Sequence, residues 1–140
     1  MAADRCLCVP VEYASYMDGT PRAIVEEFFD RMEDDTERQT VGELFDEETT
    51  ITLPGVTFRG KDAADEMLEW LEPRYEWAAK EFEHWVETNQ YVISQGSLYG
   101  VDNDGNEFAE VRYVDIYRVE DGLIQRVDIY NDLAATGVVE

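Results

Sequence analysis

The segment 107–132 constrains the fold most strongly, because two apolar-rich stretches flank the loop at residues 120–122, Glu-Asp-Gly. Glycine tolerates the positive φ that such short loops require, so this pattern predicts a long β-hairpin. A three-residue loop places Asp115 opposite Val127 in the paired strands. Side chains alternate between the two faces of a strand. One face of the predicted hairpin is therefore mostly apolar and carries Val111, Tyr113, Asp115, Tyr117, Val119, Leu123, Val127 and Ile129.

Asp115 is the one carboxylate in the middle of this apolar face. Burying an ionised carboxylate is costly unless the group is paired or protonated. Two interpretations stay open. Asp115 is either a structural residue satisfied by backbone or tyrosine donors, or a pocket acid whose raised pKa suits it to donate a hydrogen bond or to act as a base.

The opposite face of the hairpin mixes apolar and charged side chains, and it includes three of the nine arginines of the chain. We expect this face to form a homodimer interface, because acids such as Asp128 can pair with the arginines across a two-fold axis. The residues of this face are Arg112, Val114, Ile116, Arg118, Ile124, Arg126, Asp128 and Tyr130.

The chain carries 33 acidic and 11 basic residues, a net charge of −22, and its only lysines are Lys61 and Lys80. Charge of this size opposes folding at low salt, as in halophilic proteins. We therefore expect a cytoplasmic protein from a high-salt organism, with an ordinary acidic protein as the alternative. Nucleic acid is not expected as a partner, because phosphate recognition needs a basic surface. A membrane association is not expected either, since no apolar run approaches the roughly 20 residues of a bilayer span and no signal peptide is visible.

Residues 1–19 differ from the remainder, because they hold both cysteines, Cys6 and Cys8, and few acids. We expect them to be an N-terminal extension, with a short strand around 6–11 or a native start at Met17 as alternatives. Residues 20–140 are expected to form a single domain. Two cysteines and one histidine are too few for a disulfide scaffold or a zinc site. No metal is therefore expected, and no cofactor, since a glycine-rich phosphate loop is also missing.

Apolar periodicity and turn residues predict helices that lead into an antiparallel meander. Thr20 and Pro21 suit the N-cap and first position of the first helix. The stretch 74–80 fits neither element clearly. Helices are expected at 20–33, 37–45 and 61–71, and strands at 47–53, 56–59, 81–88 and 91–101 before the hairpin. This order indicates an α+β fold with helices on one face of a curved sheet.

Four pieces of sequence resemble the nuclear transport factor 2-like superfamily, in particular its SnoaL-like and ketosteroid-isomerase-like branch. They are FFDRMEDD, LFDEETTITLPG, FRGKDAADEML and YVDIYRVEDGLIQRVDIYND, and the resemblance spans roughly residues 21–135. It implies a cone of three N-terminal helices packed on a curved, mainly antiparallel sheet, with a pocket inside. Homodimers are common in that superfamily.

The resemblance assigns site positions one at a time. Asp115 matches the protonated aspartate of the isomerase oxyanion hole. Leu53 falls where the isomerases have their general base, and Phe29, or alternatively Phe28, falls where they have a tyrosine. Two of the three chemical groups are thus missing, so isomerisation by that mechanism is disfavoured.

Other branches of the superfamily fit no better. The Asp-Arg-Asp set of the limonene epoxide hydrolases matches Gln95, Ser97 and Ile129, none of which can replace it. The acid–base residue of the SnoaL-like cyclases has no confident match here. His84, the one histidine, lies on an alternating segment typical of a surface or rim residue.

Two functions from different classes remain. The first is an enzyme of isomerase, cyclase or hydrolase type acting on a hydrophobic, carbonyl-bearing small molecule, with Asp115 as acid or donor. The second is a non-catalytic ligand-binding or dimeric scaffold module. A ligand-sized cavity lined by Asp115 favours the first, and a pocket filled by aromatic side chains favours the second. The expected pocket residues are Phe29, Leu53, Gln95, Ser97, Tyr113, Val127, Ile129 and Asn131.

Overall fold

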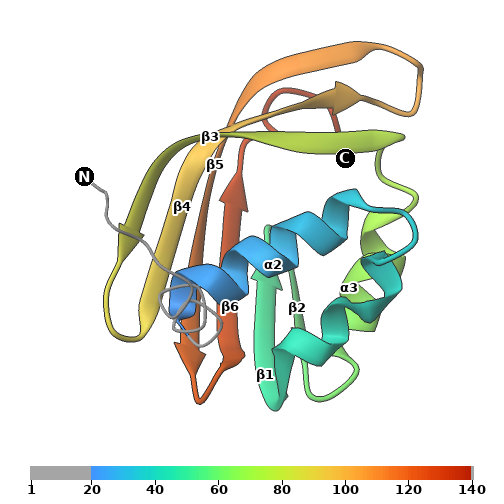
Figure 1. Cartoon of the computed structure of the whole chain (residues 1–140). Coiled ribbons are helices and arrows are strands. Elements are labelled where there is room, and N and C mark those ends of the chain that lie inside the picture. Colours follow the sequence, from blue (N-terminus) through green and yellow to red (C-terminus); the bar gives the residue numbers. More distant parts are fainter. Residues whose placement is uncertain (1–19, 140) are drawn as a thin grey trace.

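The computed structural model describes residues 20–139 as helices packed on a six-stranded sheet (Figure 1). The helical elements are α2 (Pro21–Glu33), the 3-10 helix η1 (Arg38–Leu44) and α3 (Ala63–Leu71). The strands are β1 (Phe45–Leu53), β2 (Val56–Arg59), β3 (Trp77–Glu87), β4 (Tyr91–Val101), β5 (Glu107–Glu120) and β6 (Leu123–Asn131). The expected extension, with Cys6 and Cys8, lies outside the described residues.

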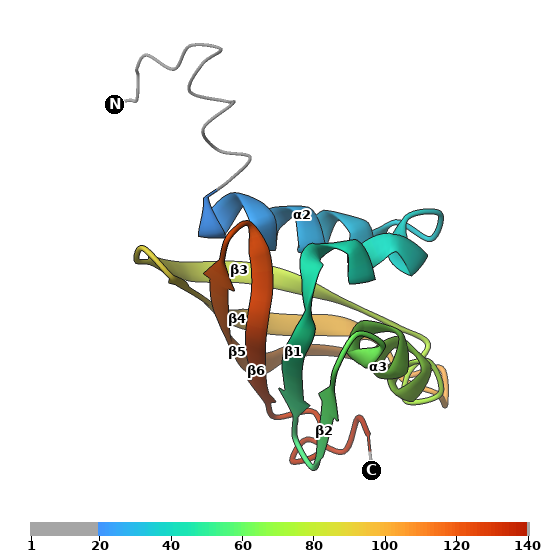
Figure 2. The ribbon, with the colours of Figure 1, turned by 90° about the horizontal axis from the view of Figure 1, so that it is seen from below.

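The sheet has the order β2-β1-β6-β5-β4-β3, and its pairs are antiparallel except β1 with β6. Figures 1 and 2 show α2 lying across the concave side of this curved sheet, with α3 beyond the β1–β2 edge. The predicted α+β class is confirmed. Two helical elements precede β1 and α3 follows β2, the same order of elements that the sequence predicts. No helix among residues 20–139 is long and apolar enough to cross a membrane.

The first helix begins as its sequence predicts. The Thr20 side chain accepts a hydrogen bond from the Ala23 amide at 3.2 Å, and Pro21 occupies the first turn, where no amide donor is needed. The buried stripe of α2 includes Phe28 and Phe29. Both rings pack against Tyr117 of β5, with centroid separations of 6.0 and 5.8 Å. This contact ties the helix to the middle of the sheet.

The hairpin of β5 and β6 forms, but its predicted register is wrong. Asp121 and Gly122 have φ of 56° and 78°, so they form a two-residue turn that suits the twist of paired strands. Val119 consequently pairs with Ile124, and a bulge follows before the regular pairing resumes. Ile124 is fully buried in the core, whereas Leu123 is only half-buried. The expected faces of these two residues are therefore exchanged.

The same bulge restores the alternation farther along the hairpin. Asp115 pairs with Ile129, not with Val127 as the three-residue loop implied. Val127 and Ile129 still face the helices. The two-residue loop shifts the expected pairing by one residue and the bulge shifts it by one more, so the predicted alternation of faces is restored. Asp115 therefore keeps its predicted face although its partner changes.

Strand β3 begins at Trp77, four residues before the expected start, and it bends sharply over the helices (Figure 1). Two glycines of β4 permit the bend. A Cβ on Gly96 would lie 2.0 Å from the Glu81 carbonyl oxygen, and one on Gly100 would lie 2.1 Å from that of Trp77. Only glycine allows such close approach of neighbouring backbones. The bend brings Lys80 of β3 within 3.7 Å of Asp115 in β5.

Candidate functional site

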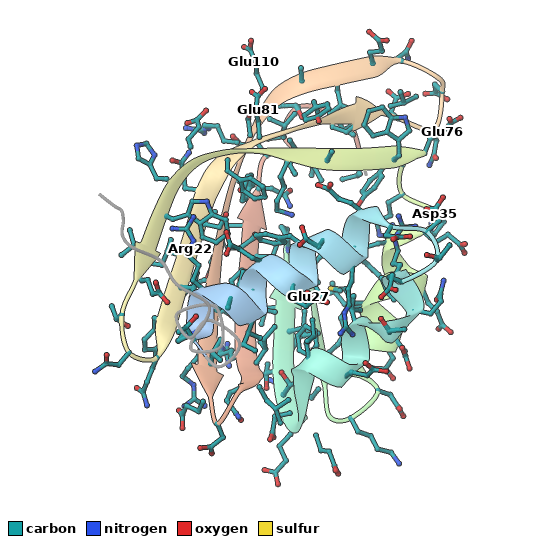
Figure 3. All side chains as sticks on the ribbon, in the orientation of Figure 1. Arg22, Glu27, Asp35, Glu76, Glu81 and Glu110 are labelled. Atoms are coloured by element: carbon teal, nitrogen blue, oxygen red, sulfur yellow. The ribbon has the colours of Figure 1, made fainter. Side chains whose placement is uncertain are left out.

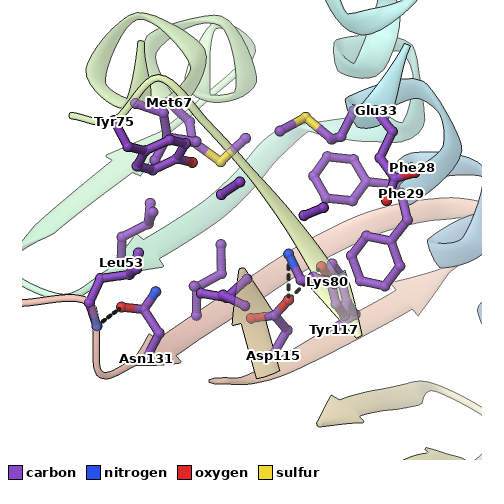
Figure 4. Close-up of a pocket in the computed structure, with 17 residues that line it drawn as sticks. Phe28, Phe29, Glu33, Leu53, Met67, Tyr75, Lys80, Asp115, Tyr117 and Asn131 are labelled. Carbon is purple, nitrogen blue, oxygen red and sulfur yellow. Dashed lines mark hydrogen bonds and ion pairs between the residues drawn. The ribbon is translucent and has the colours of Figure 1, made fainter. Parts of the chain in front are cut away.

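A cavity of about 120 Å³ lies between α2, α3 and the inner face of the sheet. Most of its wall is apolar, with Phe28, Leu53 and Met67 as examples, and Figure 4 shows polar groups of β3, β5 and β6 at its floor. Pockets for drug-sized ligands usually enclose roughly 300–1,000 Å³. An apolar cavity of about 150 Å³ holds benzene. The inner cavity therefore suits a compact molecule of about six heavy atoms.

Asp115 lines this cavity with a side chain that is 1% exposed. Its Oδ2 atom accepts a hydrogen bond from the Tyr117 hydroxyl at 3.3 Å and lies 3.7 Å from Lys80 Nζ. Its Oδ1 atom has no hydrogen-bond partner among residues 20–139. A buried polar atom without a partner is uncommon and costs stability. Oδ1 is thus a buried acceptor without a partner, on a residue that lines the cavity.

Lys80 reaches the site from β3, the edge strand that bends over the cavity. Its ammonium lies 5.0 Å from the Phe29 ring centre and 5.1 Å from that of Tyr113. Aromatic faces attract cations at such distances. Lys80 is therefore held between aromatic rings and the Asp115 carboxylate, as Figure 4 shows for its contact with Asp115.

Burial governs the protonation of these groups. Desolvation raises the pKa of Asp115, and the Lys80 charge and the Tyr117 hydroxyl oppose this rise without cancelling it. Burial, followed by the nearby Asp115 charge, raises the pKa of Tyr117 well above its ordinary value. Burial also raises the pKa of Tyr113 to about 12. Both tyrosines therefore remain protonated donors, while Asp115 holds a proton more readily than an exposed acid does.

Two further polar groups border the cavity. The Asn131 side-chain oxygen Oδ1 accepts a hydrogen bond from the Leu133 backbone amide at 3.1 Å, which fixes the orientation of the side-chain amide (Figure 4). Within the described part of the chain, its NH₂ group has no acceptor. Tyr75 contributes a partly buried hydroxyl from the segment that leads into β3. The wall thus offers donors from Asn131 and Tyr75 in addition to the Asp115–Lys80 pair.

An outer groove of about 510 Å³ adjoins the inner cavity. The two spaces share Met32, Leu71, Tyr75 and Ala78 in their walls. The groove continues outward between the end of α2, η1, α3 and the start of β3, and several carboxylates border it. These four residues therefore lie between the inner cavity and the outer groove.

The structure brings five of the predicted site residues together. Phe29, Leu53, Ile129 and Asn131 line the inner cavity with Asp115. Phe29 and Leu53, which the resemblance matched to a tyrosine and a general base, reach the cavity with apolar side chains. Asp115 and Tyr117 are the most buried ionisable residues of this wall, whereas the Lys80 side chain is 27% exposed.

Gln95 and Ser97 do not reach the cavity. In β4 the side chains of Val92, Ser94 and Leu98 face the helices, so the alternation points Gln95 and Ser97 to the opposite face. The His84 ring nitrogen Nδ1 donates to Gln95 Oε1 at 2.5 Å on that outer face. This contact accounts for the polar side chains of His84 and Gln95 without a role in the cavity.

Tyr113 and Val127 are buried behind the cavity wall. The Tyr113 hydroxyl shares a 2.8 Å hydrogen bond with the buried Ser94 hydroxyl, and its ring contacts the Lys80 ammonium. Val127 is fully buried in the main hydrophobic core, between Tyr117 and Ile51 in the sheet. Both residues support the site without lining it.

Lys80 is the main site residue that the sequence did not reveal. It belongs to the ambiguous stretch 74–80, which the structure assigns to β3 from Trp77 onward. One signal was present, since Lys80 is one of only two lysines in a chain with nine arginines. Among residues 20–139, no group of three or more histidine, cysteine or acidic side chains is arranged to hold a metal ion.

Comparisons with known proteins place this geometry in a family. Residues 25–127 match the model of the SnoaL-like domain, so the chain belongs to the SnoaL-like domain family. A search of curated proteins finds no match.

Solved structures show the same nuclear transport factor 2-like fold. A candidate SnoaL-like polyketide cyclase from Jannaschia sp. CCS1 is 17% identical, with a TM-score of 0.72 over 89% of this chain and 92% of that one. TerC, co-crystallised with polyporic acid, is 14% identical, with a TM-score of 0.70 over 81% and 92%. A ketosteroid-isomerase-like protein from Catenulispora acidiphila, in complex with trimethylamine, is 18% identical, with a TM-score of 0.66 over 79% and 85%.

Proposed function

We propose that this protein binds a small, hydrophobic, carbonyl-bearing molecule in the inner cavity and transfers a proton on it through Asp115. One observation carries the proposal: the buried Asp115 lines the cavity, and one oxygen of its carboxylate has no hydrogen-bond partner among residues 20–139. A structural aspartate is normally satisfied on both oxygens. A bound ligand, or the proton that it exchanges, supplies the missing partner.

The surrounding groups suit proton transfer next to a carbonyl. The raised pKa of Asp115 moves this acid toward the neutral range, where proton exchange in both directions is efficient. When a carbonyl compound loses a proton from the adjacent carbon, negative charge develops on its oxygen. The Lys80 ammonium and the Asn131 amide are donors placed to stabilise that charge.

The size of the site defines the ligand class. A molecule of about six heavy atoms fits the inner cavity alone. A larger ligand extends past Met32 and Tyr75 into the outer groove. Two structural neighbours with small molecules bound, polyporic acid and trimethylamine, support a ligand pocket in this fold.

A non-catalytic ligand-binding module is the second candidate. The apolar side chains of Phe29 and Leu53 at the cavity favour it, because the second acid–base group of the related isomerases is missing there. Both candidates bind the same class of ligand. They differ in whether bound ligand exchanges protons with Asp115.

Deuterium exchange tests the proposal. Cyclohexanone in D₂O exchanges the protons beside its carbonyl, and proton NMR follows the loss of signal. We expect the wild-type protein to accelerate this exchange, and Asp115→Asn to lose the acceleration by about 100-fold because the amide cannot carry the proton. Asp121→Asn, the same substitution at the exposed turn, should leave the rate unchanged.

The two candidates give different results in this assay. Cyclohexanone that raises the melting temperature of the protein without accelerated exchange identifies the non-catalytic binder. Equal exchange rates with the wild-type protein and Asp115→Asn contradict the role of Asp115.

A further inference from the structure

Lys80 has features that a simple counter-ion does not need. Its Nζ atom lies 3.7 Å from Asp115 Oδ2, which is longer than the roughly 2.7–3.2 Å of a close hydrogen bond. The other oxygen of Asp115 has no partner among residues 20–139. The contact is an ion pair without a close hydrogen bond, so the amine keeps hydrogen-bonding capacity for a ligand. The open geometry leaves room for a ligand atom beside the amine.

Lys80 lies at a mainly apolar cavity, next to an acid that can accept a proton from its amine. The Phe29 and Tyr113 rings lie about 5 Å from Nζ, so the amine is partly desolvated. Enzymes make lysines nucleophilic by placing them in apolar pockets. The side chain is nevertheless 27% exposed, which keeps the amine within reach of a small molecule.

We propose that Lys80 is a nucleophilic residue that binds an aldehyde or ketone as an imine. The inference rests on the carbonyl-bearing ligand of the proposed function and adds a covalent step to it. Asp115 is the group that moves protons during this step, because it is the nearest acid and lies on the cavity wall.

The step balances within the pair. Lys80 passes one proton to the Asp115 carboxylate, and the free amine attacks the carbonyl carbon. The carbonyl oxygen takes a proton from Asp115 and the nitrogen returns one, which gives a carbinolamine. Asp115 then protonates the hydroxyl, water leaves, and the nitrogen lone pair forms the C=N bond of an iminium ion beside the restored carboxylate. One carbonyl compound and one amine thus give one imine and one water.

The iminium ion would also make the proposed proton transfer easier. It withdraws electrons from the adjacent carbon more strongly than a neutral carbonyl group does. The proton on that carbon is therefore easier to remove, and the free Oδ1 of Asp115 lies at the same cavity to accept it. Lys80 would thus provide the activation that the missing isomerase groups provide elsewhere in this fold.

Reductive trapping tests the inference. The protein is incubated with 3-methylbutanal, which has six heavy atoms, and with sodium cyanoborohydride, which reduces an imine to a stable amine. Intact mass and peptide mapping locate the adduct. Lys61, the only other lysine, is exposed and serves as the internal comparison. We expect Lys80 to react about tenfold faster or more, because the cavity holds the carbonyl beside the amine.

Variants and a competitor complete the test. Lys80→Arg keeps the charge beside Asp115 and should remove the fast adduct, whereas Lys61→Arg should retain it. An excess of 3-methylbutanol, which fills the cavity without forming an imine, should slow the labelling of Lys80 but not of Lys61. If Lys80→Arg does not fold, the comparison of the two lysines within the wild-type protein still decides.

The failure of this inference is distinguishable from failure of the proposed function. Labelling of Lys80 no faster than that of Lys61 overturns imine formation. If the wild-type protein still exchanges cyclohexanone protons through Asp115, the proposed function stands without the covalent step. Absence of both fast labelling and exchange overturns both.

Discussion

Asp115 makes the folded protein sensitive to pH in a direction that follows from its burial. Its pKa in the folded protein is raised, whereas an unfolded aspartate titrates near 3.9. Between these values the native state binds a proton that the unfolded chain has released. The stability that Asp115 contributes is therefore complete below about pH 4 and is lost as the pH rises through the raised pKa. Each unit of elevation corresponds to about 1.4 kcal/mol.

The measurement compares the wild-type protein with Asp115→Asn. Urea unfolding from pH 4 to pH 9 gives the free energy of unfolding of both proteins. We expect the wild-type protein to lose stability relative to the variant as the pH rises, and the difference to become constant above the native pKa. A difference that does not change with pH would show that Asp115 titrates as an ordinary exposed acid.

At the residue scale, the sequence was sufficient to predict that Asp115 lies on the inner face of the sheet, but not that Lys80 lies beside it. An acid on an alternating apolar face is visible from local pattern alone. Lys80 meets Asp115 only because β3 bends over the sheet, and that bend depends on glycines of the neighbouring strand. Gln95 and Ser97 were placed by resemblance, and the alternation of β4 turns both away from the cavity.

At the element scale, the bend of β3 depends on Gly96. A Cβ at this position would lie 2.0 Å from the Glu81 carbonyl oxygen, so Gly96→Ala must push β3 away from β4. We expect a loss of about 2 kcal/mol or more in the free energy of unfolding, measured with urea. Lys80 moves with β3, so its trapping by aldehyde should slow as well. Gly42→Ala is the matched control.

Gly42→Ala is the same substitution at a position where the added Cβ atom meets no close neighbour. The nearest atom to a Cβ on Gly42 is the Ala64 Cβ at 4.0 Å, an ordinary contact. Replacing a helical glycine by alanine without strain is neutral or stabilises by roughly 0.4–1 kcal/mol. Equal stability of Gly96→Ala and Gly42→Ala would contradict the account of the bend.

Elements with strong local signals were predictable, and their pairing was not. The cap at Thr20 and the bounds of β4 follow from residues within or next to each element. The register of the β5–β6 hairpin depends on whether Asp121 also adopts positive φ and on a bulge after Ile124. Both depend on the twist of the whole sheet, which short-range pattern does not contain.

At the scale of the whole molecule, the net charge of −22 predicts that stability requires salt. Figure 3 shows acids such as Glu76, Glu81 and Glu110 extending from the fold. Repulsion between exposed charges reaches about 10 Å at 0.1 M salt and about 3 Å at 1 M. We therefore expect the melting temperature to rise steeply from low to molar potassium chloride.

A sugar separates screening from general stabilisation. Sucrose stabilises proteins by exclusion from their surface, without screening charge. If sucrose at matched osmolality raises the melting temperature as much as potassium chloride does, charge repulsion is not the cause. A melting temperature that is unchanged by salt would contradict the high-salt origin expected from the composition.

The outer face of the sheet, which carries Arg112, Ile116 and Arg126, is the surface through which we expect two copies of this acidic chain to associate. Arg112 pairs with Asp132 at 2.7 Å and Arg126 with Asp128 at 3.0 Å, so part of the acidic charge on this face is already neutralised within the chain. Ile116 lies half-buried at its centre. Tyr130, on the neighbouring strand, is 53% exposed. We predict a homodimer in which this face meets itself across a two-fold axis.

Light scattering after size exclusion, at micromolar protein in high salt, gives the mass in solution. We expect a dimer for the wild-type protein and a monomer for Ile116→Arg, because burying two guanidinium groups at the centre of the interface costs their hydration. Glu66→Gln on exposed α3 changes the net charge by the same amount and should leave the dimer intact. Circular dichroism checks that both variants fold. A monomeric wild-type protein would contradict the predicted dimer. A dimer that persists in Ile116→Arg would show that the interface lies elsewhere, because a stable interface buries about 800 Å² on each partner and would cover the centre of this face.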